Sequence, residues 1–373
     1  LRAGSSDLPT RQSGVFSSYP SARQNFPRPM SAGSSPSTSR VADLGEHALI
    51  KRIRARVPPA PSWVAVGIGD DAAVVEPARG RLDVITTDAM VEGVHFDRRF
   101  GTPADLGHKA LAINLSDLAA MGAEPRTAVL SLILPADLLV ADLDQVLDGL
   151  LTLADEHRMA LVGGNLARSP GPLCIDITAI GSIRRRTVLT RTAARAGDGL
   201  YLTGTVGSAT AGLDWLEADP NHGVPGADDP MRDCVARFLR PAPRLRAGQR
   251  VARNRIANAA MDLSDGLADA VTQLTAPRGL GAIVEAEAIP IADAARQWFS
   301  AHDRDPVASA LAGGEDYELL FALPDRPRSR ARLLSRLAKP LAVTRIGTVT
   351  AEPGLILRRQ AGDEPLPAGF RHF

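Results

Sequence analysis

The stretch "GTPADLGHKALAINLSDLAAMGAEP", residues 101–125, predicts a long helix that ends in a turn. Thr102 and Asp105 have the spacing of a capping box, in which each side chain accepts a hydrogen bond from the other residue's backbone N–H. Pro103 falls at the first helical position, where no N–H is needed, and Gly122 follows the expected end. This segment therefore predicts one helix together with the positions of its N-terminus and C-terminus.

Outward from this helix, strands and helices alternate along the chain, so we expect a mixed α/β (α+β type) fold. The expected helices cover 41–56 and 141–157, and a strand at "LDVITTDAM" is expected to end at Asp88. Further strands are expected over 126–135, 173–183, 317–324 and 343–349, and strand–turn–helix units open at residues 199 and 259. Two mixed units over 41–183 and 184–373 are the simplest account, and the pattern leaves the strand order open.

Composition excludes several classes of function. The 373 residues are 45% hydrophobic and 23% charged, which fits about two globular domains. A net charge of +1 gives no reason to expect nucleic-acid binding, and no apolar segment is long enough to span a membrane. Two cysteines exclude a disulfide framework and have no metal-ligand spacing, so a cytoplasmic location is expected. The chain has only three lysines and no P-loop motif, so a nucleotide must be bound without a P-loop lysine.

Residues 1–40 form a leader rich in Ser, Pro and Arg, with Asp7 as the only acid. Such a segment buries too little apolar surface to offset its ordering entropy, so we expect it to be disordered. A transit peptide has a similar composition, but the first residue is Leu and Met30 could be the true start. We expect no function from this leader.

Acidic residues recur beside predicted strand ends and helix starts. "GIGDDAAVV", residues 67–75, places Asp70 and Asp71 at a glycine-flanked bend before an apolar run that is expected to be a buried strand. Taken alone, this stretch is a solvated turn. The other such acids are Asp88, then Asp262 and Asp265 of "MDLSDGL", and Glu315 and Asp316 of "GGEDYEL". Asp117 is the exception, because it lies within the predicted helix.

Each motif also has a purely structural interpretation. Asp117 can be a helix-surface acid. In "DLSDG", Ser264 or Asp265 can cap the helix that follows. In "GGEDYEL", Gly313 and Gly314 permit the unusual backbone angles of a turn.

Yet no lysine or arginine stands within these acidic motifs. Carboxylates gathered without basic partners repel one another, and a divalent cation removes that repulsion. Mg²⁺ prefers oxygen ligands and combines one or two carboxylates with substrate phosphates. The acids therefore indicate several magnesium ions and phosphoryl transfer.

The motifs in series carry a resemblance to a known family. They are "GIGDDAAVV", "TTDAMVEGVHF", "HKALAINLSDLAAMGAEP", "VGGNLARS", "LTRTAARAGD", "YLTGTVGSATAGL", "MDLSDGL", "GGEDYELLF" and "RIGTV". From about residue 45 to the closing "GFRHF", the chain resembles the thiamine-monophosphate kinases of the aminoimidazole ribonucleotide synthetase superfamily. The resemblance implies two α/β domains, a homodimer formed through a β-barrel shared by the N-terminal domains, and the conversion of ATP and thiamine monophosphate to ADP and thiamine diphosphate.

Site residues follow from the resemblance position by position. It implies magnesium ligands at Asp70, Thr86, Thr87, Asp88, Asp117, Asp262 and Asp265. It implies ATP contacts at Gly164, Asn165, Arg191 and Ser264, and contacts with thiamine phosphate at His95, Glu315 and Phe370. Many members have Asp where this chain has Asn165. An amide oxygen still coordinates Mg²⁺ with one negative charge fewer, so Asn165 is expected to contact both nucleotide and metal.

The residue types suit these roles. The Arg191 guanidinium fits phosphate oxygens, and His95 can donate to a phosphate or simply pack beside Phe96. Phe370 can stack on a cationic thiazolium ring or pack at the C-terminus, and Glu315 can accept from a pyrimidine amine. Direct in-line transfer onto an already ionised phosphate needs no general base, so positioning and metal charge would carry catalysis without a catalytic side chain.

Two alternatives remain open. Another ATP-using enzyme of the superfamily, such as a purine-pathway synthetase, would share the fold. Selenophosphate synthetases and hydrogenase-maturation dehydratases instead need a cysteine, ahead of Asp70 or near the C-terminus respectively, and this chain has none at either place. A non-catalytic nucleotide-binding regulator is the other alternative, and Asn165 is the one feature in its favour.

Overall fold

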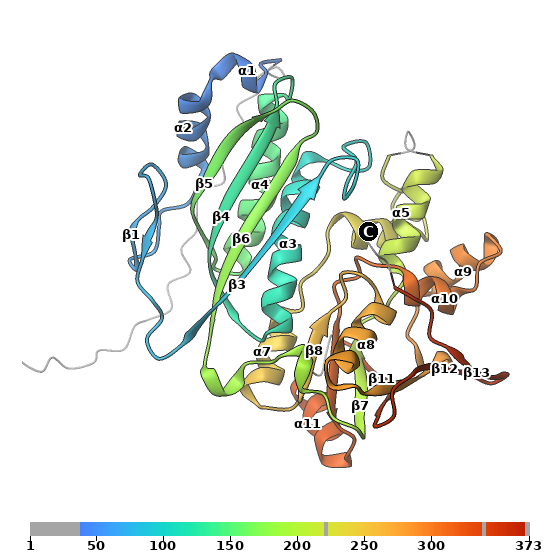
Figure 1. The fold of residues 1–373 in the computed structure, drawn as a ribbon. Helices are drawn as coiled ribbons and strands as arrows, with labels where there is room; N and C mark the ends of the chain where they lie inside the picture. The colour runs from blue at the N-terminus through green and yellow to red at the C-terminus, as the bar shows by residue number, and fades with distance from the viewer. Residues whose placement is uncertain (1–37, 220–222, 338–340, 370–373) are drawn as a thin grey trace, which may run out of the picture. The chain divides into compact units, whose positions relative to one another are not determined.

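The computed structural model describes residues 38–219, 223–337 and 341–369 (Figure 1). The predicted leader, apart from residues 38–40, and the predicted substrate contact Phe370 lie outside these residues. Within them, no helix has the length and apolar character needed to cross a membrane.

A four-stranded sheet forms in the first half of the chain, in the order β3-β6-β4-β5. Its strands are β3 Leu82–Val91, β4 Glu124–Pro135, β5 Ala160–Ser169 and β6 Cys174–Ile183. The pair β4 and β5 is parallel, and the other pairs are antiparallel. Helices α3 Pro103–Ala120 and α4 Val140–Glu156 pack on one face of this sheet (Figure 1). The opposite face carries exposed side chains such as Ile85, which is 67% exposed.

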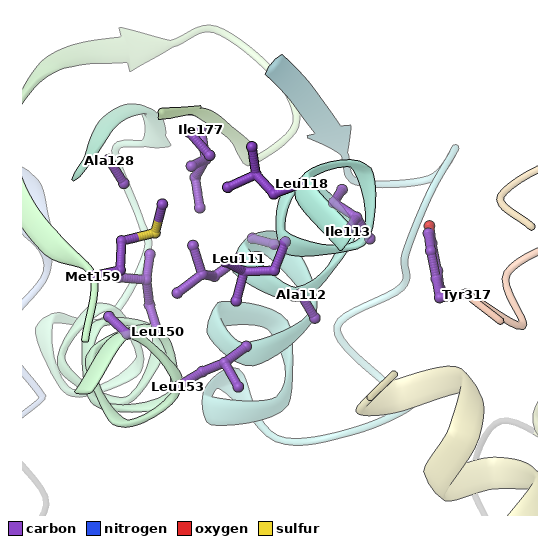
Figure 2. Close-up of a cluster of buried hydrophobic side chains, with 14 of the residues drawn as sticks. Leu111, Ala112, Ile113, Leu118, Ala128, Leu150, Leu153, Met159, Ile177 and Tyr317 are labelled. Carbon is purple, nitrogen blue, oxygen red and sulfur yellow. The ribbon is translucent and has the colours of Figure 1, made fainter. Parts of the chain in front are cut away.

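Helix α3 is the central element of the fold. Its predicted capping box, Thr102 with Asp105, is confirmed, and Gly122 follows the helix with φ 73°. Figure 2 shows Leu111 and Leu118 directed toward the sheet and α4, while Tyr317 of the second half lies on the other side of α3. A helix buried on several sides in this way has an apolar sequence nearly all round.

A seven-stranded sheet forms in the second half, in the order β13-β12-β9-β11-β7-β10-β8. Its strands are β7 Asp198–Thr203, β8 Ala259–Asp262, β9 Gly281–Glu285, β10 Leu319–Pro324, β11 Val343–Thr350, β12 Leu355–Arg359 and β13 Gly362–Pro365. The helices are α5 Ser208–Ala218, α6 Arg232–Leu239, α7 Leu245–Arg253, α8 Leu267–Thr275, α9 Asp293–Ala301, α10 Pro306–Ala312 and α11 Pro327–Leu337. The mixed α/β prediction is therefore confirmed, and the domain boundary between residues 183 and 184 stays a prediction.

Three local predictions were wrong. The helix expected over 41–56 is broken at Gly45, with φ 72°, into α1 Val41–Leu44 and α2 Glu46–Arg56. Strand β3 continues to Val91, so Asp88 lies inside a strand rather than at its end.

The third concerns the run after Asp71. The expected buried strand is only β2 Val74–Val75, paired with β1 Val64–Val66, and Val74 is 53% exposed. The pair of acids therefore sits in an exposed loop of a two-stranded ribbon, as the solvated-turn interpretation holds.

Candidate active site

A cavity of about 650 Å³ is lined by both halves of the described chain. It is bounded by the end of β3 and the loop after it, by α3, α5 and α6, by the turn between β8 and α8, and by the loop between α10 and β10. Its acidic residues are Asp88, Asp97, Asp117, Glu217, Asp262, Asp265 and Glu315, and its aromatic residues are Phe96, Phe100, Phe238 and Tyr317. An acidic and aromatic lining of this kind suits a ligand with both a ring and bound cations.

Three carboxylates from three elements meet at this cavity. Asp88 comes from β3, Asp117 from α3 and Asp262 from the end of β8. Burial, together with the negative charges of Asp117 and Asp176, raises the pKa of Asp88 to about 7. Burial likewise raises the pKa of Asp262 to about 7, with Asp117 and Asp88 adding to the effect. These side chains therefore lie close enough to oppose one another's ionisation.

Two hydroxyl groups hold this cluster in place. Thr86 Oγ1, on the α3 side of β3, donates to Asp117 Oδ2. Ser116 Oγ on α3 donates to Asp262 Oδ2 at 2.7 Å. Helix α3 therefore contacts the first sheet through Asp117, which accepts from Thr86, and the second sheet through Ser116, which donates to Asp262.

Two of the acids, Asp117 and Glu315, have basic partners from outside the acidic motifs. The positive charge of Arg191, in a short 3₁₀ turn, lowers the pKa of Asp117, although burial raises that pKa by more. Lys109 of α3 lies 2.8 Å from Glu315. Both cations come from outside the acidic motifs, so the sequence around each acid does not reveal them.

Among the described residues, no three His, Cys, Asp or Glu side chains stand together in an arrangement that could hold a metal ion. The chemistry of the donors nevertheless fits Mg²⁺. Asp88, Asp117 and Asp262 are hard oxygen ligands, and a divalent charge would remove the mutual repulsion that adds to burial in raising the pKa of Asp88 and Asp262.

The turn after β8 and the loop before β10 are joined backbone to backbone. Glu315 N–H donates to the Ser264 carbonyl at 2.7 Å, and Tyr317 N–H donates to the Leu263 carbonyl at 3.0 Å. Gly266 is the N-cap of α8, which has no side-chain cap, so the interpretation of Ser264 or Asp265 as a cap was wrong. Ser264 and Asp265 instead line the cavity.

Glycines in the loop before β10 serve close packing rather than unusual backbone angles. A Cβ on Gly313 would lie 2.0 Å from Thr210 Oγ1, and one on Gly314 would lie 2.4 Å from the Ser264 carbonyl oxygen. The positive φ values fall instead on Glu315, at 64°, and Tyr317, at 49°. These two non-glycine residues are strained, as is common at functional sites.

Buried Asp316 lies between them. Its carboxylate accepts hydrogen bonds from the backbone N–H groups of Gly207 at 2.7 Å and Ala209 at 3.1 Å. Burial raises the pKa of Asp316 to about 7 against these hydrogen bonds. Asp316 therefore fixes the first turn of α5, which forms one wall of the cavity.

Sequence reasoning missed two buried ionic groups. Lys109 is 2% exposed and Glu318 is fully buried. Glu318 accepts from Arg237, Arg244 and the Thr203 hydroxyl. For Lys109 a signal was available, because it lies eight residues before Asp117 on the same helix and therefore near the same face.

Other predicted ligands point elsewhere. Thr87 faces the opposite side of β3 from Thr86, and its Oγ1 lies 3.1 Å from Asp176 Oδ1 and 3.0 Å from Thr178 Oγ1. Asp70 lies in the exposed loop between β1 and β2 and is not among the described residues that line the cavity. Its Oδ1 accepts from the backbone N–H of Asp71 at 2.9 Å.

Gly164 and Asn165 lie on β5, at the edge of the first sheet farthest from β3. Asn165 is exposed and pairs with Ser131, which pairs with Asp176. Paired residues on neighbouring strands share a face, so Asn165 lies on the face that also bears Thr87 and Asp176, away from α3. Within this chain, the structure does not bring Gly164 and Asn165 to the cavity lining.

His95 does line the cavity, and its Nδ1 accepts from the backbone N–H of Val91 at 3.1 Å. Arg191 donates to the Gln273 side chain on α8. Among the predicted residues, the structure therefore brings Asp88, Asp117, Asp262, Asp265, Ser264, Glu315 and His95 to the cavity, with the charge of Arg191 acting on Asp117.

Residues 69–183 match the family "AIR synthase related protein, N-terminal domain", and residues 195–360 match the corresponding C-terminal domain family. Thiamine-monophosphate kinase from Synechococcus elongatus is 36% identical over 348 residues, covering 89% of this chain and 98% of that protein. The same enzyme from Escherichia coli K12 is 39% identical over 337 residues, covering 88% and 98%. The chain belongs to the thiamine-monophosphate kinase family. The sequence resemblance and the two-part fold that it implied are thereby confirmed.

Solved structures agree. Thiamine-monophosphate kinase from Stenotrophomonas maltophilia K279a has a TM-score of 0.73 at 37% identity, covering 84% of this chain and 96% of that chain. A structure described as "AaThiL complexed with AMPPCP and TMP" has a TM-score of 0.69 at 31% identity, covering 90% and 99%. Escherichia coli HypE, a hydrogenase maturation protein, has a TM-score of 0.70 at 22% identity, covering 87% and 98%, which shows a shared fold alone.

Proposed function

We propose that this protein transfers the γ-phosphoryl group of ATP to thiamine monophosphate, forming ADP and thiamine diphosphate. One observation carries the proposal: relatives named thiamine-monophosphate kinase are 36–39% identical over nearly their full length. A related structure is described as a complex with AMPPCP and TMP, which supports ATP as the co-substrate.

Magnesium is the finer part of the proposal. Asp88, Asp117 and Asp262 would hold Mg²⁺, with Thr86 orienting Asp117 and Asp265 nearby in the lining. When bound, the cations would supply positive charge between two anionic reactants. Roles for Asp70, Thr87 and Asn165 stay predictions, and Thr87 would use a main-chain oxygen because its hydroxyl faces away.

The remaining polar groups of the chain would orient the reactants. Arg191 and Ser264 would contact the nucleotide, and His95 would donate to a phosphate. Glu315 would accept from the pyrimidine amine of the acceptor, at the part of the lining that includes Phe238. Because an ionised acceptor phosphate needs no general base, these residues would act by positioning alone.

A homodimer is also proposed, through the face of the first sheet away from α3 and α4. Ile85 on that face is 67% exposed although it lies mid-strand, and burying it against a second sheet would remove this apolar surface from water. A cytoplasmic location stays a prediction.

The dimer is tested by Ile85→Arg, which would place a charge in the shared face. We expect the wild type to sediment as a dimer and the variant as a monomer. The control is Val224→Arg, which alters another exposed apolar residue, 51% exposed, and should leave the dimer intact. A monomeric wild type, or a dimeric Ile85→Arg protein, would contradict the assignment of this face.

The activity is tested by incubating the protein with ATP, Mg²⁺ and thiamine monophosphate and measuring thiamine diphosphate. Thiamine and purine-pathway ribonucleotides serve as parallel acceptors. Product from thiamine monophosphate alone supports the proposal. Product from a ribonucleotide would favour another enzyme of the superfamily, and ATP binding without any product would favour a regulator.

A further inference from the structure

The ion pair between Lys109 and Glu315 joins α3 to the loop before β10. Lys109 is 2% exposed, and its Nζ lies 2.8 Å from Glu315 Oε2 and 3.7 Å from the centre of the Phe238 ring. Glu315 and Phe238 line the cavity, whereas Lys109 is not among the described lining residues. Lys109 therefore contacts two lining residues, Glu315 and Phe238, without lining the cavity itself.

Glu315 is held at both of its ends. Its backbone has φ 64°, and its N–H donates to the Ser264 carbonyl at 2.7 Å. Its side chain is tied to Lys109 through Oε2. In the part of the chain that the structure describes, Oε1 receives no hydrogen bond, so one carboxylate oxygen remains available.

The choice of lysine matters because this chain otherwise uses arginine for almost all of its positive charge. Three lysines stand among 43 basic residues. Arg244 binds nearby Glu318 through both carboxylate oxygens, with Nε 2.7 Å from Oε2 and Nη2 on Oε1. A guanidinium grips a carboxylate in this two-point manner, whereas an ammonium group makes a single contact. Lysine therefore leaves open an oxygen that arginine would occupy.

Stability alone does not account for this pair. Burial lowers the pKa of Lys109, and the Glu315 charge only partly offsets that effect. Burying such a pair costs about as much in desolvation as it returns, so apolar residues would serve packing equally well. The Phe238 ring, whose face attracts cations, adds a favourable contact to the Lys109 ammonium group behind the cavity.

We propose that Lys109 is a positioning residue for the phosphate acceptor. It holds Glu315 by Oε2 so that Oε1 can accept a hydrogen bond from an amino group on the substrate ring. The inference rests on the proposed function, in which the aminopyrimidine of thiamine monophosphate carries that amino group.

The test is a double-mutant cycle with Lys109→Met, Glu315→Gln and both together. Measurements are kcat, the KM for each substrate, and calorimetric binding of thiamine monophosphate without ATP. If Lys109 acts through Glu315, each single change raises the KM for thiamine monophosphate about tenfold, the loss of one hydrogen bond. The double variant then shows little further rise, and the KM for ATP is unchanged.

Controls separate positioning from a structural role. Lys51→Met, at an exposed position on α2, should change nothing. Unfolding midpoints of every variant are measured, and Glu315→Gln keeps the proposal testable if Lys109→Met fails to fold. Lys109→Arg should also raise the KM for thiamine monophosphate, because its fork takes both carboxylate oxygens.

Three results would overturn the inference: an unchanged KM in Lys109→Met, additive effects in the double variant, or a Lys109→Arg protein with wild-type KM. A wild type that neither binds nor phosphorylates thiamine monophosphate would overturn the proposed function as well. The wild-type assay therefore distinguishes the two failures.

Discussion

Two groups of acids in this protein differ in how their negative charge is compensated. Glu318 is fully buried, and two arginines and a threonine satisfy its oxygens. Asp88, Asp117 and Asp262 instead face one another, and their mutual repulsion helps to raise the pKa of Asp88 and Asp262. An acid paired with arginines, such as Glu318, stabilises the fold. Acids that repel one another, such as Asp88, Asp117 and Asp262, indicate a site for a cation.

The largest expected effect lies among the acids that repel one another. Asp262→Asn removes one negative ligand, so we expect thiamine diphosphate formation to fall by about 10³-fold, comparable to losing a strong electrostatic contact in a transition state. The same change relieves repulsion between acids, so the metal-free protein should be no less stable in urea.

The matched control is Asp155→Asn, the same substitution at an exposed position on α4. It should retain wild-type activity. An active Asp262→Asn protein, or one that unfolds more easily than the wild type, would contradict the assignment of Asp262 to the proposed cation site.

Replacing Glu318, the acid paired with arginines, should instead lower the stability of the protein. Glu318→Gln leaves Arg237 and Arg244 without a carboxylate, so we expect a loss of about 3 kcal/mol in the free energy of unfolding, measured by urea denaturation. Glu285→Gln is the control, because it removes a surface pair with Arg358, at 3.8 Å, and should change stability little. Equal losses in the free energy of unfolding for both variants would contradict the assignment of a stabilising role to Glu318.

The smallest expected effect is a pH dependence of stability at Asp316. Like Glu318 this carboxyl is hydrogen-bonded, and like Asp88 and Asp262 it has a pKa raised to about 7. As the pH rises from about 4 to 7, the unfolded chain releases this proton before the folded one does. Ionisation therefore favours unfolding over this range.

Asp316→Asn lacks that titration. The wild type's stability advantage over the variant should accordingly be greater at pH 5 than at pH 8, measured by urea denaturation at both values. An advantage that is constant or grows with pH would show that the carboxyl is ionised throughout this range in the folded protein.

How far the sequence could predict the site differs from motif to motif. The acids of "MDLSDGL" and "GGEDYEL" were identified as candidates, yet nothing local showed that β8 and β10 are neighbours, which brings these motifs together. Thr86 and Thr87 were treated alike, although the two-residue period of a strand sends their side chains to opposite faces. The extent of β3 beyond Asp88 was missed because a central acid interrupts the apolar pattern.

The sequence by itself determined what depends on neighbours along the chain: the helix after Thr102 with its capping box, the mixed order of helices and strands, and the family with its chemistry. Capping and periodicity act over a few residues, so they can be recognised without the fold. Only the tertiary structure decided that Lys109 reaches Glu315 and that Ser116 reaches Asp262, residues 206 and 146 positions apart. Contacts between such distant residues depend on strand order and helix packing, which local patterns leave open.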